Sequence, residues 1–408
     1  MFKKIYIFII AILLCIGAFC YTNKEMQNDV YFTIPTGNYI LENGIDEEEP
    51  LTYHNNLKYT KLRYGFDIVV AEIYNHFDFD GLYVFSLIIT MTITLSLFYI
   101  TYKIAKSPTI SAILVMIVLL NVCDTFTVRA QIISYLIYTW AFYFMYMLWE
   151  TKQRKYSIAL IILSILLLMF HSSVWILYPV LFLPFVIDAF AGQIFNKAPL
   201  REFNSLFVTF IAVIITGLLT PLKLSPYTYP FMSIGFVAKE IIAELQFIPS
   251  WPFYIILLYV GIILLSSFFI KKNWLVLMSY GMLCFSMIAL RNYFITLYIL
   301  TIIIAICVKF INDKLINKKY YQVICKIPII VFACLSVIFL FKCHENFTIK
   351  VADVDYVSRS LYPVKAVEFI KQNIDYKNAN FYTEFLISNM NYKLIFKDEN
   401  FALFEQVN

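Results

Sequence analysis

Charged residues are scarce in this sequence. They make up 14% of the 408 residues, while 61% are hydrophobic; a typical soluble domain is roughly 25% charged. A water-soluble fold of this length is therefore excluded. The chain also has no G-x-x-x-x-G-K-[ST] loop, no Rossmann glycine pattern and no H-E-x-x-H helix. These absences disfavour ATP-driven transport and the use of nucleotide sugars by a conventional soluble domain.

Metal-ligand spacings are absent as well. None of the 8 cysteines forms a C-x-x-C pair, and most lie inside apolar runs, where a cysteine is a small buried hydrophobe. No cofactor is indicated with certainty and no metal site is assigned. Use of a divalent cation remains an open alternative. The apolar run after Lys3 and Lys4 has the shape of a signal peptide, but Phe19 is too large for a cleavage position, so we expect an uncleaved first helix.

Long apolar runs are what the sequence has in abundance. A membrane-spanning helix needs about 20 mainly apolar residues, and shorter runs can cross in a packed bundle. The sequence predicts eleven such helices, at about residues 5–21, 82–102, 108–123, 131–149, 156–170, 174–191, 203–221, 252–270, 274–290, 293–310 and 328–342. The predicted fold class is an all-α polytopic membrane protein, with a transmembrane domain over residues 1–342.

Basic residues predict how the chain is oriented, because Lys and Arg in short loops resist translocation. With the N-terminus inside, the cytoplasmic segments hold twice as many basic residues as the outer loops before the C-terminal tail. We therefore expect a multi-pass protein of the plasma membrane, with a cytoplasmic N-terminus and an extracytoplasmic C-terminus. Its expected surroundings are membrane lipids, and nothing indicates a nucleic acid partner.

The first segment outside the membrane, residues 22–80, is too long to be a connector. It is acidic, and Gly37, Gly44 and Pro50 stand in it at expected turn positions. An amphipathic helix over Tyr64–Asn75 is predicted to close it. Loops longer than about 15 residues in compact proteins are usually functional or disordered, so this loop is where we expect the chemistry.

Two further segments lie on the same predicted side. Residues 222–251 are rich in Pro and Tyr and turn amphipathic over Val237–Gln246, which is typical of a helix lying along the membrane interface. The tail, residues 343–408, is predicted to be a small extracytoplasmic α/β domain, with a helix over Val364–Gln372 and strands over Asn380–Leu386 and Tyr392–Phe396.

Short motifs follow one another in a fixed order along the chain. They are Gly37 to Gly44 (G-x-x-I-L-x-x-G), Arg129-Ala130-Gln131, Met169-Phe170-His171-Ser172, Thr220-Pro221, Ile242-Ala243-Glu244-Leu245, Arg291-Asn292 and Tyr362 to Ile370. In this order they resemble a bacterial branch of the GT-C superfamily of membrane glycosyltransferases, which use polyprenyl-phosphate-linked sugars. The sequence departs from that branch at Ala130, Ser172, Thr220 and Leu245, but keeps its charged and imidazole residues.

The resemblance implies a catalytic Asp or Glu early in the first outer loop, beside the first helix. Sugar transfer from a lipid phosphate needs a carboxylate to accept the acceptor's proton and cations to stabilise the departing phosphate. Asp29 is the candidate base, and Asp124 is a second acid or a metal ligand. Arg129 and Arg291 are predicted at outer helix ends, where a guanidinium would hold a lipid phosphate through two bonds.

Four further residues are predicted to bind substrate: His54, Gln131, His171 and Glu244. His171 is singled out because an ionisable group between two apolar runs is costly to bury without a partner. Each candidate has an ordinary alternative. Asp29, Asp124 and Glu244 also suit solvated carboxylates at loops or helix ends, the arginines suit anchors for lipid headgroups, and His171 suits a hydrogen bond between two helices.

The expected function is transfer of a sugar from a polyprenyl-phosphate donor to a glycan, lipid or protein acceptor on the outer face. Three alternatives stay open: a polysaccharide polymerase or ligase, a transporter or flippase, and a GT-C-like scaffold without catalysis. The large loop comes first in this chain, which favours the transferase over the polymerase. Transporters often contain internal repeats, and none is visible here.

Overall fold

The computed structural model describes residues 2–49, 59–122, 125–196, 200–234, 246–270, 272–315, 327–351, 392–397 and 402–406. The chain divides into two compact units. The first comprises Met1–Asn23 and Gln27–Val351, and the second comprises Lys24–Met26 and Ala352–Asn408. The first is a helical bundle, whereas the described part of the tail in the second is a pair of strands.

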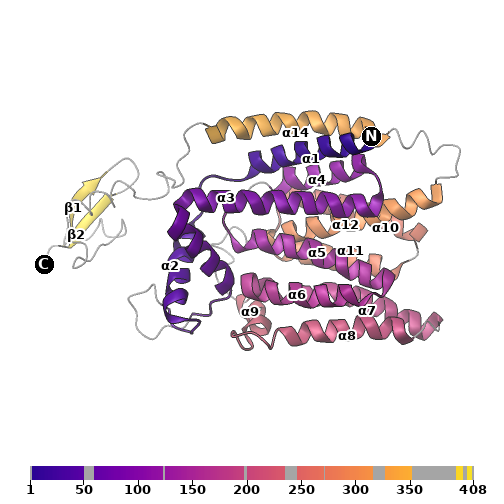
Figure 1. Ribbon diagram of the computed structural model, residues 1–408, viewed down its shortest axis with the longest axis horizontal. Helices are drawn as coiled ribbons and strands as arrows, with labels where there is room; N and C mark the ends of the chain where they lie inside the picture. Colours follow the sequence, from indigo (N-terminus) through magenta and orange to yellow (C-terminus); the bar gives the residue numbers. More distant parts are fainter. Residues whose placement is uncertain are drawn as a thin grey trace. The chain divides into compact units, whose positions relative to one another are not determined.

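The bundle is built from helices, most of which run roughly parallel to one another (Figure 1). A 3-10 helix, η2 (Ser172–Val174), joins two of them. The α-helices are α1 (Phe2–Tyr21), α2 (Asn28–Asn43), α3 (Tyr64–Ala105), α4 (Pro108–Val122), α5 (Ala130–Thr151), α6 (Arg154–His171), α7 (Leu177–Asn196), α8 (Leu200–Thr216), α9 (Ser225–Ile234), α10 (Ser250–Ile270), α11 (Asn273–Ile288), α12 (Leu290–Leu315) and α14 (Ile327–Val351).

Eight of the described helices are long and apolar enough to cross a membrane: α1, α3, α5, α6 with η2, α7, α10, α12 and α14. The shorter apolar helices are α4, α11 and the part of α8 over Asn204–Thr216. Each of the eleven predicted spans overlaps one of these helices. The prediction of an all-α polytopic membrane protein is therefore confirmed.

Helices at the centre and at the edge of the bundle differ in burial. In the most apolar stretches of α5 and α12, 78% and 72% of the residues are buried, whereas the figure for α14 is 11%. Side chains such as Phe268, Val337 and Phe341 are more than half exposed. Exposed apolar side chains of this extent are stable against lipid tails, which are apolar themselves, and a helix can lie among them because its backbone groups bond within the helix.

The long helix α3 changes direction at Asp78, whose φ of 54° and ψ of −155° are not helical. Its 42 residues would span about 63 Å as one straight helix, twice the roughly 30 Å of a bilayer core. The part after the kink contains the predicted span 82–102. The part before it carries Asp67 and Glu72 and packs against α2 outside that span, across one end of the bundle (Figure 1).

We call this end of the bundle the α2 end. It is where α2, the first part of α3, the start of α5 and the end of α6 meet. Backbone and side-chain contacts tie these elements together, since Ser172 donates from its amide and its hydroxyl to the carbonyl oxygen of Leu62, at 2.8 Å each. The amide of Asn23 likewise donates to the carbonyl oxygen of Phe126 at 2.8 Å.

Gly37 is not the turn residue that the sequence predicts. It lies inside α2, while Gly44 ends the helix with a φ of 83°. A Cβ at Gly37 would stand 2.1 Å from the carbonyl oxygen of Asp67 and 2.6 Å from the Cβ of Ala71. Glycine is required at this position because the two helices touch backbone to backbone. Pro50 lies outside the described residues.

In the second unit, the tail forms an antiparallel hairpin of β1 (Tyr392–Lys397) and β2 (Ala402–Gln406). Tyr392 pairs with Gln406 and Lys397 with Ala402, with an irregularity between Leu394 and Phe396. Strand β1 coincides with one predicted strand. The predicted helix over Val364–Gln372 and the strand over Asn380–Leu386 lie outside the described residues, so the α/β character of the tail is not supported.

Candidate functional site

Four charged side chains form a continuous chain of ion pairs at the α2 end. Asp29 stands in the first turn of α2, and Arg129 is the residue before α5. The Nε and Nη2 atoms of Arg129 lie 3.0 and 2.9 Å from Oδ2 of Asp29. The Nη1 atom of Arg63, just before α3, is 3.7 Å from the same oxygen, and its Nε is 3.1 Å from Oδ1 of Asp67. The order is therefore Arg129, Asp29, Arg63, Asp67.

Burial increases from Asp29 through Arg63 to Asp67. The side chain of Asp29 is 37% exposed, those of Arg129 and Arg63 are 17% exposed, and that of Asp67 is 0% exposed. Neither carboxylate oxygen of Asp67 completes a hydrogen bond of ordinary geometry within the described part of the chain. Burial raises the pKa of Asp67 to about 7, against the opposing effects of Arg63 and the Thr33 hydroxyl.

His171 lies beside this chain at the end of α6. Its Nδ1 is 2.7 Å from Oγ of Ser134, one turn into α5. The positive charges of Arg63, Arg129 and Arg291 all act on His171. The charges of three arginines from three separate elements therefore act on one imidazole, and together they favour the binding of an anion at this end of the bundle.

The sequence predicts several members of this group, and the structure brings them together. Arg291 is exposed in the first turn of α12 and forms no ion pair with the residues that the structure describes. Gln131 is partly buried in the first turn of α5, on the side of Ser134. The other three candidates, Asp124, His54 and Glu244, lie outside the described residues.

The Asp29–Arg129 contact changes how these two candidates are interpreted. The sequence suggested separate roles, one as a base and the other as a phosphate ligand. In the structure they neutralise each other directly. The pair uses only Oδ2 of Asp29 and the Nε and Nη2 atoms of Arg129, so a bound anion would compete with Asp29 for these two donors.

Sequence reasoning missed Arg63 and Asp67. Both belong to the loop and helix that the sequence assigns to the outer side, and their i, i+4 spacing is the pattern of an ion pair on a helix. That pattern is common on solvated surfaces, and so it gave no reason to expect a buried carboxylate. The close approach of α2 at Gly37, which shields Asp67 from solvent, is not visible in the sequence.

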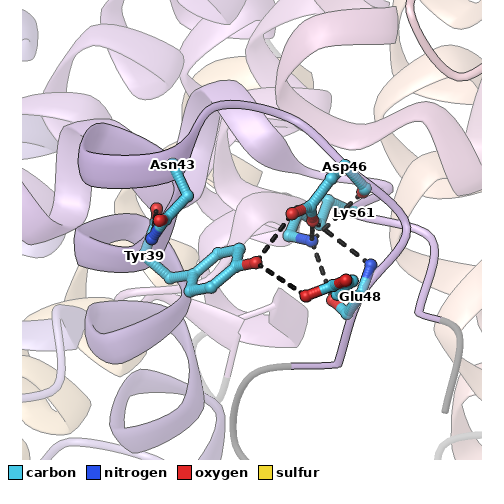
Figure 2. Close-up of polar contacts among 5 residues, drawn as sticks. All are labelled: Tyr39, Asn43, Asp46, Glu48 and Lys61. Atoms are coloured by element: carbon cyan, nitrogen blue, oxygen red, sulfur yellow. Dashed lines mark hydrogen bonds and ion pairs between the residues drawn. The ribbon is translucent and has the colours of Figure 1, made fainter. Parts of the chain in front are cut away.

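A second polar cluster holds the chain just before Arg63 (Figure 2). The ammonium group of Lys61, which is 0% exposed, donates to the carboxylate of Asp46 and to the carbonyl oxygens of Asp46 and Glu48, the last two at 3.1 and 2.9 Å. The hydroxyl of Tyr39 donates to the other oxygen of Asp46 at 2.7 Å. This hydrogen bond raises the pKa of Tyr39 to about 12, so the phenol remains a donor at neutral pH.

The consequence of this cluster is a fixed position for Arg63. Lys61 is anchored to the segment that follows α2, and Leu62 is anchored to η2 through Ser172. Arg63 follows as the residue before α3, with its guanidinium between the carboxylates of Asp29 and Asp67. The arrangement of the site is therefore supported by hydrogen bonds from two other elements.

A polar cavity of about 420 Å³ lies at the opposite end of α5. Its lining includes Trp149, over whose ring Lys272 and Lys152 stand at 4.6 and 5.5 Å. Asp188 accepts hydrogen bonds from the Trp149 indole and from the start of α11, and Glu150 is 3.6 Å from Lys309. The acidic groups in this lining have partners within the protein, and lysine beside tryptophan is typical of a membrane interface.

Comparison with known proteins does not assign the site to a family. A search against protein-family models finds no match to this chain, and no curated protein matches it. The geometry of the α2 end is therefore the basis for the functional interpretation.

Proposed function

We propose that this protein is a membrane glycosyltransferase that moves a sugar from a polyprenyl-phosphate-linked donor to an envelope glycan, lipid or protein acceptor. The observation that carries the proposal is the chain of ion pairs among Arg63, Arg129, Asp29 and Asp67 at one end of a membrane bundle, beside a histidine on which the charge of Arg291 also acts. A phosphate whose lipid tail lies in the bilayer would reach the protein at a bundle end. Guanidinium groups match the phosphate oxygens in charge and geometry.

The acidic and the basic residues have different roles in this reaction. The acceptor oxygen bonds to the anomeric carbon while the bond from that carbon to the donor phosphate breaks, and the electron pair leaves with the lipid phosphate. The acceptor proton passes to the carboxylate of Asp29. Arg129 and Arg291 stabilise the charge on the departing phosphate. Arg129 holds Asp29 in the free protein, and a donor phosphate that takes over these N–H groups would leave the Asp29 carboxylate to accept the proton.

We further propose that the α2 end faces the outside of the cell at the plasma membrane. Support comes from the opposite end of the bundle, where Lys103, Lys152, Lys272 and Lys309 lie over aromatic rings. Lysines concentrate on the cytoplasmic side of membrane proteins. Polyprenyl-phosphate sugars presented on the outer leaflet would meet the arginines directly.

A second candidate function is binding of a lipid-linked phosphate without transfer. The specific observation in its favour is the Asp29–Arg129 ion pair, which occupies both the proposed base and a proposed phosphate ligand. The two functions differ in one respect that is measurable. A transferase consumes the lipid-linked sugar, whereas a binding protein or scaffold leaves it intact.

The experiment compares purified wild-type protein with Asp29→Asn in lipid nanodiscs. Both are supplied with a set of polyprenyl-phosphate sugars and with glycolipid extracted from cells that lack the protein, and products are followed by mass spectrometry. We expect transfer by the wild type and none by Asp29→Asn, because the amide cannot accept the proton. Glu42→Gln, an exposed acid on the same helix, is the matched control. Transfer by Asp29→Asn at the wild-type rate would rule out Asp29 as the base.

A further inference from the structure

Arg63 is shared between two carboxylates that differ sharply in environment. It lies 3.7 Å from Asp29, which is partly exposed, and 3.1 Å from Asp67, which is completely buried. Asp29 has a second cation in Arg129. For Asp67, Arg63 is the one cation joined to it by an ion pair within the described residues. Moving Arg63 away would therefore remove the ion pair of Asp67, whereas Asp29 would keep its ion pair with Arg129.

A buried carboxylate that loses its cation cannot stay charged at low cost. The side chain of Asp67 is not exposed to water, and within the described residues the Thr33 hydroxyl is the one uncharged group that acts on its charge, without forming a hydrogen bond of ordinary geometry. Under these conditions a carboxyl group takes up a proton instead of remaining ionised. Any ligand that draws Arg63 toward itself must therefore drive protonation of Asp67.

We infer that Arg63 and Asp67 form a proton-coupled gate for an anion, so that a phosphodiester engages Arg63 while Asp67 takes up one proton. The inference rests on the proposed role of the α2 end as a lipid-phosphate site, but it does not depend on sugar transfer. It assigns to Asp67 a function distinct from that of Asp29. Asp67 positions Arg63 and sets the net charge of the site, but does not touch the ligand.

The groups that face Asp67 agree with this assignment. From α2 the Thr33 hydroxyl and Asp29 act on it, and from its own helix Arg63 does so. Tyr59 is close enough for its charge to matter, but burial raises the pKa of this phenol to about 12 and keeps it neutral. With the pKa of Asp67 itself near 7, a proton is available to it at physiological pH, and loss of Arg63 removes an effect that holds this pKa down.

The sign of the pH dependence follows from linkage. The liganded protein binds one more proton than the free protein at pH values between the pKa of free Asp67 and the higher pKa that Asp67 has in the liganded protein. Affinity should therefore be constant below about pH 6.5 and fall by about tenfold per pH unit above pH 7.5. A phosphomonoester would confuse this measurement because its second pKa is about 6. The probe is therefore the methyl ester of a short prenyl phosphate, a phosphodiester whose single charge is constant over this range.

The test measures binding of this probe to the full-length protein in nanodiscs between pH 6 and 9. We expect the pH dependence above for the wild type, and constant affinity for Asp67→Asn, which mimics the protonated acid. Glu72→Gln removes an exposed carboxylate one turn further along the same helix, and it should behave as the wild type. Calorimetry at pH 8, in two buffers of different ionisation enthalpy, should detect uptake of about one proton by the wild type and none by Asp67→Asn.

Each outcome leads to a decision. Constant wild-type affinity, or equal proton uptake by the wild type and Asp67→Asn, overturns the gate while leaving an anion site in place. Failure of the wild type to bind the probe at any pH overturns both the gate and the proposed function. Proton-coupled binding without sugar transfer supports the gate and overturns the transferase. Thermal unfolding and size-exclusion chromatography show whether Asp67→Asn has a folding defect. If it does, Asp67→Glu, which keeps a carboxyl group, replaces it in the test. Loss of the pH dependence in a folded Asp67→Glu protein would contradict the gate.

Discussion

The contact between α2 and α3 at Gly37 predicts a large effect from a single methyl group. In Gly37→Ala, the new Cβ would stand 2.1 Å from the carbonyl oxygen of Asp67, while ordinary van der Waals contact begins near 3.4 Å. The two helices would have to separate by about 1 Å. Neither the carbonyl oxygen nor the Cβ of Ala71 is the flexible end of a side chain, so the helices themselves must move.

The magnitude follows from two opposing effects on the free energy of unfolding. Alanine favours a helix over glycine by about 1 kcal/mol, whereas forcing an extra carbon into a packed contact costs about 1–3 kcal/mol. The net loss of stability is therefore small, at most about 2 kcal/mol. The site should suffer more. Asp29 is on the displaced helix, and its contacts of 2.9 and 3.0 Å with Arg129 do not survive a shift of that size.

The assay pairs thermal unfolding in detergent with sugar transfer in nanodiscs. Gly37→Ala should unfold at a slightly lower temperature and lose about 10²-fold in transfer rate, the scale for catalytic groups misplaced by 1 Å. Gly192→Ala, in α7, is the matched control because no atom lies within 4 Å of its new Cβ. Adding Ala71→Gly to Gly37→Ala should restore only part of the loss, since the carbonyl of Asp67 stays in place. If Gly37→Ala and Gly192→Ala behave alike, the close helix contact does not hold Asp29 in position.

Three further predictions concern other parts of the molecule. Lys61→Met should lower the free energy of unfolding by about 1–3 kcal/mol, because it leaves buried oxygens without their donor; unchanged denaturant unfolding would contradict this. Arg129→Lys and Arg291→Lys should each weaken phosphodiester binding by about 1–3 kcal/mol. If both variants bind the phosphodiester as the wild type does, these arginines are interfacial anchors and not phosphate ligands. In a variant without native cysteines, Glu42→Cys on intact cells should react with a membrane-impermeant thiol reagent and Gln153→Cys should not; the reverse pattern would place the α2 end in the cytoplasm.

The transmembrane helices could be predicted because they depend on local sequence. A run of apolar residues of sufficient length is stable in lipid whatever its neighbours are, and all eleven predicted runs overlap helices. Helix α2 was not predicted, because Pro35 and Gly37 within it are typical of turns. Its packing against α3 outweighs that local preference, as tertiary contacts often do.

The candidate site was predictable only in part. Asp29, Arg129, His171 and Arg291 stand out in the sequence as charged or ionisable residues beside apolar runs. In the structure Asp29 contacts Arg129, and the charges of Arg129 and Arg291 act on His171. The sequence could not show that Asp29 and Arg129, one hundred positions apart, form an ion pair. It equally could not show that Asp67 is buried.

The amino-acid sequence by itself determined that this protein crosses the membrane many times, because hydrophobic length and loop charge are properties of consecutive residues. Only the tertiary structure decided which charges neutralise one another and which carboxylate is removed from water. Ion-pair strength and desolvation depend on distances of a few ångströms between residues far apart in the chain. Those distances are set by the close packing of α2 against α3 at Gly37 and by the hydrogen bonds that fix Lys61 and Leu62, the two residues before Arg63.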